Sequence, residues 1–320
     1  MDSEKEYLRW LRNASEDNME EALKSMREDE IEDSFYKNLS FGTGGLRGII
    51  GAGTNRMNVY TVGKATQGVA AYLLRNYEVP SVVIGYDSRV KSEVFARTAA
   101  CVFAANGVKV HIWSVLNPVP TVSFATRYLK ASAGIIITAS HNPAKYNGYK
   151  VYAEDGCQIT TEAAAEIQQE IDKVDIFTDI KNMDYENALK REMITYIPDV
   201  VLDAFIDEVK KQSVLFGEKI DKNTAIVYSP LNGTGYLPVT RVLKEAGYNN
   251  ITVVEEQRLP DGKFPTCPYP NPEVKEAMSL GMEYARKLNA DLLLATDPDC
   301  DRVGIAVKDN CGKYVLLSGN

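Results

Sequence analysis

The sequence is poor in the residues that cross-link a chain or hold zinc. It has five cysteines among 320 residues, and they are scattered without any Cys-x-x-Cys pair. The odd number and the spacing argue against both a disulfide framework and a zinc site, and they predict reduced thiols. Histidine is also scarce, with two residues in the chain.

Long apolar runs and an excess of positive charge are missing as well. No stretch approaches the roughly 18 to 20 apolar residues of a membrane span, and the first residues, MDSEKEYLRW, do not have the pattern of a secretion signal. Lys and Arg total 36 against 44 acidic residues, a net charge of −8. We therefore expect a cytoplasmic protein without a membrane or nucleic-acid partner, in which local basic sites for small anions remain compatible with the composition.

A repeated order of elements is present instead. A strand pattern in 81–89, a helix pattern in 92–107 and a strand pattern in 108–115 form a βαβ unit, and the same order recurs in 224–256. Charges around recurring apolar positions in 5–37 predict amphipathic helices packed on this body. The predicted fold is α/β, with two similar α/β domains whose mixed, mostly parallel sheets are sandwiched by helices.

The chain length suits two domains of ordinary size. A polar stretch that reaches Pro198 separates the two repeats, so we place the first domain at 1–198 and the second at 199–311. Residues 312–320 follow a predicted hairpin turn at Asp309 to Gly312 and are expected to begin a third domain.

The segment ITASHNPAKYNGYK, residues 137–150, places Ser140 just after an apolar strand pattern in 133–138. Ser140 could be a nucleophile served by His141, a helix cap, or something else. Neighbouring side chains on an extended backbone point in opposite directions, so we expect His141 to be poorly placed to accept the Ser140 proton. The Gly-x-Ser-x-Gly elbow of hydrolases is also missing, which disfavours a serine hydrolase.

A second stretch, DPDCDR, follows a strand pattern in 291–296. Asp297, Asp299 and Asp301 meet at one point if the loop curls, and packed carboxylates repel unless a divalent cation balances them. A solvated acidic turn is the alternative, but ligands of α/β proteins bind beyond the carboxyl ends of strands. An EF-hand is excluded because Arg302 stands where its loop needs glycine, and the open oxygen set favours Mg²⁺.

Two further features bear on the function. Pro143 and the pair Asn147-Gly148 predict a shaped loop over 139–148, and a serine in such a loop beside a metal site suggests phosphate chemistry. The glycine-rich FGTGGLRG, residues 41–48, is a weak signal alone, but its Arg47 suits an anion contact. His111 lies in an alternating strand pattern and is interpreted as a packed strand histidine.

Taken together, FGTGGLRG, TASHNP, YNGYK, PNPE and DPDCDR resemble motifs of the α-D-phosphohexomutases, the phosphoglucomutase and phosphomannomutase enzymes. The resemblance covers nearly the whole chain and includes the branch with phosphopentomutases. It implies a phosphosugar mutase that moves a phosphoryl group between the C1 and C6 oxygens of a hexose, or C5 of a pentose, through a bisphosphate intermediate. The implied small molecules are a sugar phosphate, Mg²⁺ and a bisphosphate activator such as glucose 1,6-bisphosphate.

The same resemblance implies roles for individual residues. Ser140 carries the phosphoryl group in the first domain, and its phosphate joins the acidic loop of the second domain in holding Mg²⁺. The metal ligands are Ser140, Asp297, Asp299 and Asp301. The predicted catalytic residues are Ser140, His141, Lys150 and Arg47, and the predicted phosphate-binding residues are Arg47, Arg302 and Asn142.

The sequence also departs from the family. Its sugar-reading loop, of the Gly-Glu-x-Ser-Gly kind, and its loop for the distal phosphate, of the Arg-x-Ser-Gly kind, do not occur here. We therefore expect an N-terminal half that carries phosphate but turns over slowly, and the sugar preference cannot be assigned. Two alternatives remain open: a metal-dependent aspartyl-phosphate phosphatase built on DPDCD, and a sugar-phosphate-binding fragment without catalysis.

Overall fold

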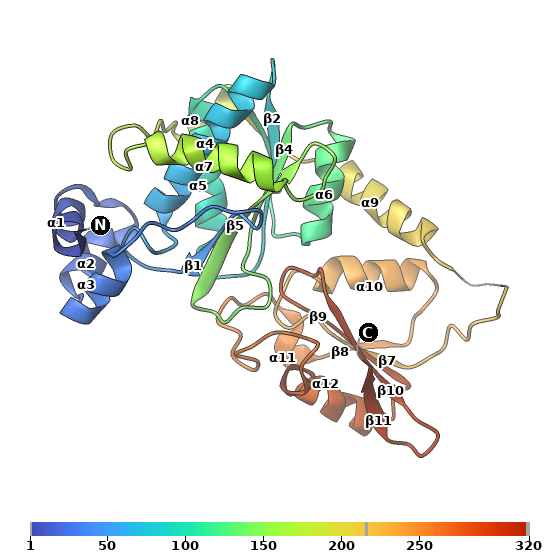
Figure 1. The fold of residues 1–320 in the computed structure, drawn as a ribbon. Helices are drawn as coiled ribbons and strands as arrows, with labels where there is room; N and C mark the ends of the chain where they lie inside the picture. Colours follow the sequence, from blue (N-terminus) through green and yellow to red (C-terminus); the bar gives the residue numbers. More distant parts are fainter. Residues whose placement is uncertain (1, 215–216, 318–320) are drawn as a thin grey trace.

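The computed structural model describes residues 2–214 and 217–317 and forms two α/β domains (Figure 1). The first contains a six-stranded sheet in the order β1-β5-β4-β2-β3-β6. Its strands β4, β2, β3 and β6 are parallel, whereas β5 is antiparallel to both β4 and β1. The strands are β1 (Leu46–Ile49), β2 (Ser81–Tyr86), β3 (Lys109–Ile112), β4 (Ala133–Ile137), β5 (Tyr146–Ala153) and β6 (Ile194–Tyr196).

Helices cover both faces of this sheet. They are α4 (Val59–Asn76), α5 (Ser92–Ala105), α6 (Val119–Tyr128), α7 (Thr161–Lys173) and α8 (Tyr185–Lys190). Successive side chains of a strand point to opposite faces. In β4, Ile135 and Ile137 join the core that includes α4, α5 and α7, whereas Ile136 packs with Val122 of α6 on the other face. The central strands β2 and β4 are buried on both faces, which explains why they are apolar throughout.

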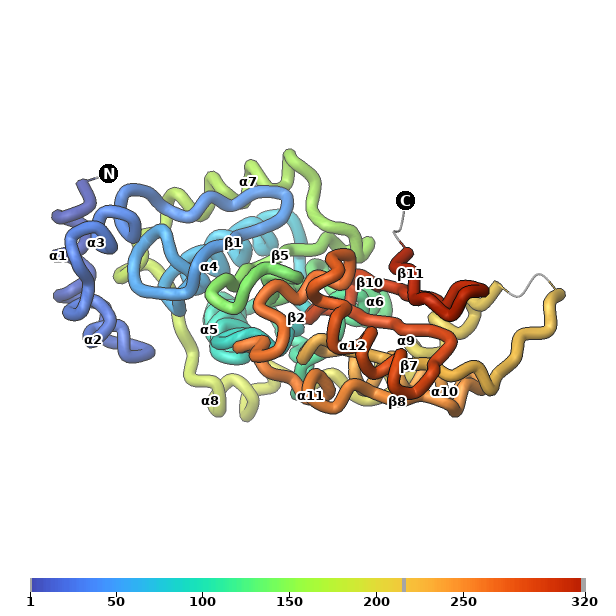
Figure 2. Tube along the Cα trace, turned by 90° about the horizontal axis from the view of Figure 1, so that it is seen from below, coloured from blue at the N-terminus to red at the C-terminus, as the bar shows by residue number. Residues whose placement is uncertain are grey.

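The N-terminal residues form a separate helical cluster at the end of the first domain away from the second (Figures 1 and 2). Trp10 lies at its centre, with ring centroids 5.7 Å from Phe35, 5.4 Å from Tyr60 and 5.5 Å from Phe177. The amphipathic helices predicted over 5–37 are therefore confirmed. They are α1 (Ser3–Asn13), the 3₁₀ turn η1 (Glu16–Asn18), α2 (Met19–Lys24) and α3 (Glu28–Phe35).

The second domain contains a five-stranded sheet in the order β11-β10-β9-β7-β8. The strands are β7 (Ile226–Ser229), β8 (Ile251–Val253), β9 (Leu292–Thr296), β10 (Val303–Lys308) and β11 (Tyr314–Leu317). The helices are α9 (Asp199–Lys211), α10 (Tyr236–Glu245), α11 (Glu255–Arg258) and α12 (Lys275–Leu288). α12 packs on β7 and β9, and α9 lies between α6 of the first domain and α10 (Figure 1).

The two sheets share a four-stranded unit, which confirms the internal repeat. β3-β2-β4-β5 in the first domain corresponds to β8-β7-β9-β10 in the second, with the same order and the same strand directions. The β4–β5 connection, residues 138–145, and the β9–β10 connection, residues 297–302, therefore occupy equivalent places. These are the loops that carry Ser140 and the three aspartates.

The predicted start of a third domain at 312–320 contains a strand of the second sheet. Within that range β11 pairs with β10, and residues 318–320 lie outside the described residues. The predicted boundaries at residues 198 and 311 remain predictions. Among the described residues, no helix is long and apolar enough to cross a membrane.

The loop predicted over 139–148 is shorter than expected. Asn147 and Gly148 belong to β5 and form no turn, because β5 already begins at Tyr146. The pair resembles a turn signal, but Gly148 is needed for close packing: a Cβ there would lie 2.5 Å from the Thr138 carbonyl oxygen. Asn147 Nδ2 donates to the Val90 carbonyl at 3.0 Å, so its amide serves a tertiary contact.

Two other local expectations also need correction. The glycine-rich segment 41–48 is a loop only in its first half, because Leu46–Ile49 forms β1 and pairs with β5. The strand pattern at 251–256 ends at Val253, and Glu255 begins α11.

Candidate active site

The two equivalent loops meet where the domains touch. Ser140 Oγ donates a hydrogen bond to Asp297 Oδ2 at 2.9 Å. Thr138 Oγ1 lies 3.1 Å from Asp299 Oδ2. The amide of Val119, at the start of α6, donates to the Asp299 carbonyl at 2.9 Å. Both loops follow the carboxyl ends of central parallel strands, where α/β folds bind ligands.

Ser140 has a backbone conformation that the sequence analysis did not foresee. Its φ is +53°, in the left-handed region, and its amide donates to Thr138 Oγ1 at 2.8 Å. This turn brings the neighbouring ring to the same side, so His141 Nδ1 lies 3.3 Å from Ser140 Oγ. The expectation that His141 points away from Ser140 was therefore wrong, because it assumed an extended backbone.

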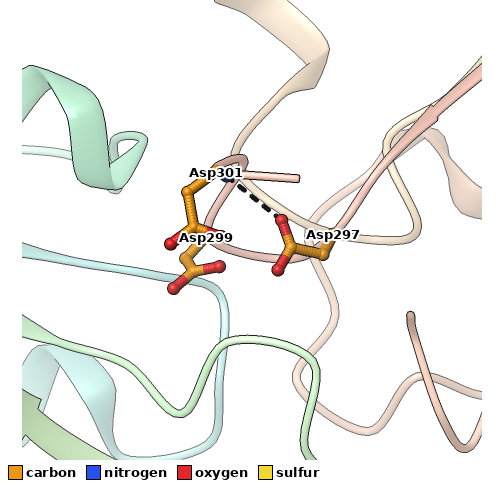
Figure 3. Close-up of side chains that lie close together, drawn as sticks. All are labelled: Asp297, Asp299 and Asp301. Atoms are coloured by element: carbon orange, nitrogen blue, oxygen red, sulfur yellow. Dashed lines mark hydrogen bonds between the residues drawn. The ribbon is translucent and has the colours of Figure 1, made fainter. Parts of the chain in front are cut away.

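The three aspartates form one cluster in the β9–β10 connection (Figure 3). Each offers a carboxylate oxygen, and these oxygens lie within 4.8 Å of one another. Asp297 and Asp299 are fully buried, whereas Asp301 is more exposed. Asp297 Oδ1 accepts hydrogen bonds from the amides of Asp301 at 3.1 Å and Arg302 at 3.0 Å, which curls the loop around this carboxylate.

Burial and mutual repulsion set the protonation of the cluster. Burial, followed by the charge of Asp299, raises the pKa of Asp297 to about 9. Burial acts to raise the pKa of Asp299, but the charge of Lys150 together with hydrogen bonds from Asp297, Lys150 and Thr138 outweighs it, and the pKa is lowered. Lys150 Nζ lies 3.2 Å from Asp299 Oδ2 and 3.8 Å from Asp301 Oδ2. The cluster therefore holds a proton at neutral pH in place of a further positive charge.

The donor set fits a divalent cation. Asp299 Oδ1 is buried and has no hydrogen-bond partner among the described residues. A buried carboxylate oxygen without a partner is costly, and three carboxylates around one point are hard oxygen ligands of the kind that Mg²⁺ prefers. Ser140 Oγ, hydrogen-bonded to Asp297, lies within reach of the same space.

Cationic side chains lie around the rim of this site. Arg47 projects from β1 and is exposed, with Nη1 3.3 Å from Asn142 Oδ1. Arg302 Nη1 pairs with Glu273 Oε2 at 3.2 Å. Burial lowers the pKa of His141, and the charges of Arg302 and Arg47 lower it further, so the ring is neutral near pH 7. All the predicted site residues thus gather at one place.

Sequence reasoning missed part of the site. Asp87 and Arg89 follow β2, beside β4, and both side chains are buried. Asp87 Oδ2 accepts a hydrogen bond from Thr138 Oγ1 at 2.7 Å. The signal was available, because DSR follows a strand end just as the serine and aspartate motifs do. His111, in contrast, lies away from these loops in β3, with Nδ1 3.0 Å from Thr195 Oγ1.

Comparisons with known proteins match both domains. The family model described as phosphoglucomutase/phosphomannomutase, alpha/beta/alpha domain I matches residues 38–176, and the model for domain II matches 203–312. A phosphoglucomutase from Staphylococcus saprophyticus is 36% identical over 311 residues, which is 97% of this chain and 56% of the relative. A phosphoglucomutase from Staphylococcus haemolyticus is 37% identical over 289 residues, 90% of this chain and 52% of the relative.

A solved structure supports the fold. A phosphoglucomutase/phosphomannomutase family protein from Burkholderia thailandensis has a TM-score of 0.66 at 21% identity, covering 87% of this chain and 55% of that one. The chain spans about half the length of the curated relatives it matches.

Proposed function

The chain belongs to the phosphoglucomutase/phosphomannomutase family, and from this premise we propose that Ser140 carries a phosphoryl group as part of a phosphosugar mutase. The observation that carries the proposal is the contact between the two repeated loops. Ser140 Oγ lies 2.9 Å from Asp297 Oδ2, beside a carboxylate cluster suited to a cation. A hydroxyl at such a place is positioned to exchange a phosphoryl group.

The proposed reaction balances as an exchange of one ester for another. A bond forms between Ser140 Oγ and phosphorus while the bond between phosphorus and one sugar oxygen of a bisphosphate breaks. The serine proton passes to the neutral ring of His141, whose Nδ1 lies 3.3 Å from Oγ, and the released sugar oxygen takes up that proton. In the return step the phosphoryl group passes to a different hydroxyl of the sugar, and Ser140 regains its proton.

The aspartates are proposed to hold Mg²⁺. Asp297, Asp299 and Asp301 would be its ligands, together with an oxygen of phosphorylated Ser140. When bound, the ion offsets the charge of the phosphoryl group and acts as a Lewis acid. Lys150 keeps the carboxylate of Asp299 ionised through its contact at 3.2 Å.

The rim cations are proposed to bind the phosphate of the substrate. Arg47 contacts Asn142, two residues from Ser140, and Arg302 follows the acidic loop; their guanidinium groups can form paired hydrogen bonds with phosphate oxygens. Because the two similar relatives are phosphoglucomutases, glucose phosphates are the first substrates to test. Interconversion of the sugar phosphates is proposed for the whole protein.

The test is phosphorylation of the chain by glucose 1,6-bisphosphate with Mg²⁺. We expect intact-mass spectrometry to show one added phosphoryl group and peptide mapping to place it on Ser140. Ser140→Ala should abolish the added mass. Ser279→Ala, a matched serine on α12 whose Oγ donates to the Glu276 carbonyl at 2.7 Å, should not change it. Full labelling of Ser140→Ala would refute the proposal.

Hydroxylamine separates the remaining alternatives. It cleaves acyl phosphates but leaves phosphoserine intact, so a label that resists it is expected here. A label that hydroxylamine removes would indicate a carboxylate carrier in the acidic loop, as in an aspartyl-phosphate phosphatase. Sugar phosphate binding without any label would indicate a binding module.

A further inference from the structure

Arg89 is a buried arginine to which the proposed chemistry assigns no role. It lies just after β2, and its side chain is fully buried. Its guanidinium faces the β4–β5 connection and donates to four backbone carbonyls, three in that connection and one at the start of β5. Nη2 binds the carbonyls of Ser140 and Asn142, and Nη1 binds those of Pro143 at 3.0 Å and Tyr146 at 3.2 Å.

These bonds replace regular backbone pairing. The connection 138–145 contains no helix or strand, and its internal backbone bonds are single turns, such as Asn142 N to the Ala139 carbonyl at 3.1 Å. A planar guanidinium with five donors can hold several acceptors in a fixed arrangement, which the point charge of a lysine cannot do. Arg89 therefore supplies the contacts that define the shape of this loop.

Asp87 forms an ion pair with Arg89, accepts its backbone amide at 2.9 Å, and also reaches the other side of Ser140. Asp87 Oδ2 lies 3.4 Å from Arg89 Nε and accepts a hydrogen bond from Thr138 Oγ1 at 2.7 Å. Thr138 Oγ1 in turn accepts the amide of Ser140 at 2.8 Å. The peptide group before Ser140 is thus held through Thr138, and the peptide group after it is held by Arg89. Together they fix the left-handed turn at this residue.

The second domain covers this arrangement. The guanidinium carbon of Arg89 lies 5.1 Å from the ring centroid of Phe264, which is buried. A Cβ on Gly262 would lie 2.4 Å from Val90 N and 2.6 Å from the Ser88 carbonyl oxygen. This glycine therefore lets the second domain press directly on the backbone around Arg89. The second domain, which supplies the three aspartates, therefore also covers Arg89, the residue that holds the backbone of Ser140.

We propose that Arg89, held by Asp87, is a positioning residue for phosphoryl transfer: it fixes the turn at Ser140 and so directs Oγ toward the aspartate loop. This inference rests on the proposed function. Arg89 contacts backbone carbonyls and none of the reacting groups, so its loss should lower the rate of transfer without changing the affinity for the phosphoryl donor.

The variants must separate positioning from folding. Removing Arg89 alone would leave the buried carboxylate of Asp87 unpaired, so the main variant is the double change Asp87→Asn with Arg89→Met, which keeps the charge balanced. Arg89→Lys keeps the positive charge but loses the planar guanidinium group with its five donors. Arg75→Met is the matched control, because Arg75 is half exposed and pairs with Glu166 and Glu170 on the surface.

The first measurement is single-turnover phosphorylation of Ser140 over a range of glucose 1,6-bisphosphate concentrations. For the double variant we expect the maximal rate to fall by roughly 100-fold while the half-saturating concentration stays unchanged. Arg89→Lys should lie between this variant and the wild type. Added guanidinium ion should restore part of the rate in the double variant, and Arg75→Met should match the wild type.

The second measurement is hydrogen exchange of the same proteins without bisphosphate. Amides in residues 138–147 should exchange faster in the double variant, whereas those of β2 and β4 should keep their protection. A folded double variant with an unchanged maximal rate would overturn the proposal, and so would lost protection spread evenly over the first domain.

The two measurements also separate this inference from the proposed function. If the wild type takes up no phosphate, the proposed function fails. Hydrogen exchange alone then decides whether Arg89 fixes the β4–β5 connection. Faster exchange confined to 138–147 would still support the positioning of Ser140. Unchanged exchange there would refute it.

Discussion

The β4–β5 and β9–β10 connections occupy the same place in the repeated unit but present different chemistry. Each follows a buried parallel strand and leads into an antiparallel one. Each contains a left-handed residue, Ser140 with φ +53° and Cys300 with φ +57°. The first presents a hydroxyl and the second three carboxylates. The shared topology determines where the loops lie, and the side chains determine what each can do.

The two loops also differ in what holds them. The acidic loop is held partly by one of its own proposed metal ligands, because Asp297 accepts the amides of Asp301 and Arg302. The amides of Val119 and Thr234 add bonds from outside the loop, to the carbonyls of Asp299 and Pro298. In the serine loop, residues 138–145, Ser140 is held by Thr138 at the start of the loop and by Arg89 from outside it, and neither is a proposed metal ligand. In the serine loop, a mutation can remove the supporting residue Arg89 and leave the proposed ligand Ser140 in place. At Asp297 this is impossible, because the same side chain is the proposed ligand and the support. This difference decides which substitutions are informative.

The largest expected effect tests whether the two loops form one metal site. Asp299→Asn, which leaves the backbone bonds of Asp297 intact, should weaken Mg²⁺ binding by about two orders of magnitude, because it removes a charged oxygen ligand. Calorimetric titration measures this, with the exposed Asp207→Asn on α9 as the control. Phosphorylation of Ser140 should strengthen Mg²⁺ binding by the wild type. Equal affinity before and after phosphorylation would mean that the loops act separately.

The next effect concerns the strand that follows the serine loop. Gly148→Ala should lower the free energy of unfolding by about 2 kcal/mol, because the added Cβ meets the backbone of Thr138 at 2.5 Å. Urea unfolding measures the change. Gly44→Ala is the control, since a Cβ there meets no atom within 4 Å. Equal stability of the two variants would show that β5 can shift, and the serine loop would then be less tightly held than we conclude.

A smaller effect should appear as pH dependence of the acidic loop. Asp297, with its pKa raised to about 9, holds a proton that Mg²⁺ must displace. Since fewer protons compete as pH rises, Mg²⁺ affinity should increase between about pH 6 and about pH 8, by at most about tenfold per pH unit for one proton. Titrations in buffers with different ionisation enthalpies would detect the released proton. A pH-independent affinity would contradict this protonation state.

Much of this arrangement follows from local sequence. The apolar runs before Ser140 and Asp297 located both loops at strand ends, because central parallel strands are buried on both faces and read as continuous apolar segments. The internal repeat of the α/β unit could be predicted from the sequence for the same reason. Asn147-Gly148 misled the prediction because the same two residues serve a turn or a closely packed strand, and only the neighbouring strands β1 and β4 decide between them.

The missed features depend on contacts between distant segments. The strand end before Asp87 and Arg89 marks their place in the sequence, but it does not reveal the role of Arg89, which arises from carbonyls more than 50 residues away. The left-handed turn at Ser140 is likewise stabilised by Thr138 and Arg89 and not by a glycine. The error about His141 followed directly, because the direction of its ring depends on that turn.

The smallest expected effect concerns the rim beside the acidic loop. Arg302 Nη1 lies 3.2 Å from Glu273 Oε2, and the two side chains are 35% and 59% exposed. Because exposed pairs contribute about 0–1 kcal/mol, Glu273→Gln should leave the free energy of unfolding unchanged within about 0.5 kcal/mol. It should nevertheless tighten the binding of inorganic phosphate by about two- to threefold, because it frees Arg302 and removes a nearby negative charge.

Competition between inorganic phosphate and glucose 1,6-bisphosphate in the phosphorylation of Ser140 measures that change, with Glu276→Gln on α12 as the matched control. Weaker phosphate binding in Glu273→Gln would mean that Glu273 orients Arg302 toward the anion and does not compete with it. The Arg302 side chain would then depend on an external support, as the serine loop depends on Arg89, and self-support in the acidic loop would apply only to Asp297 and the backbone it holds.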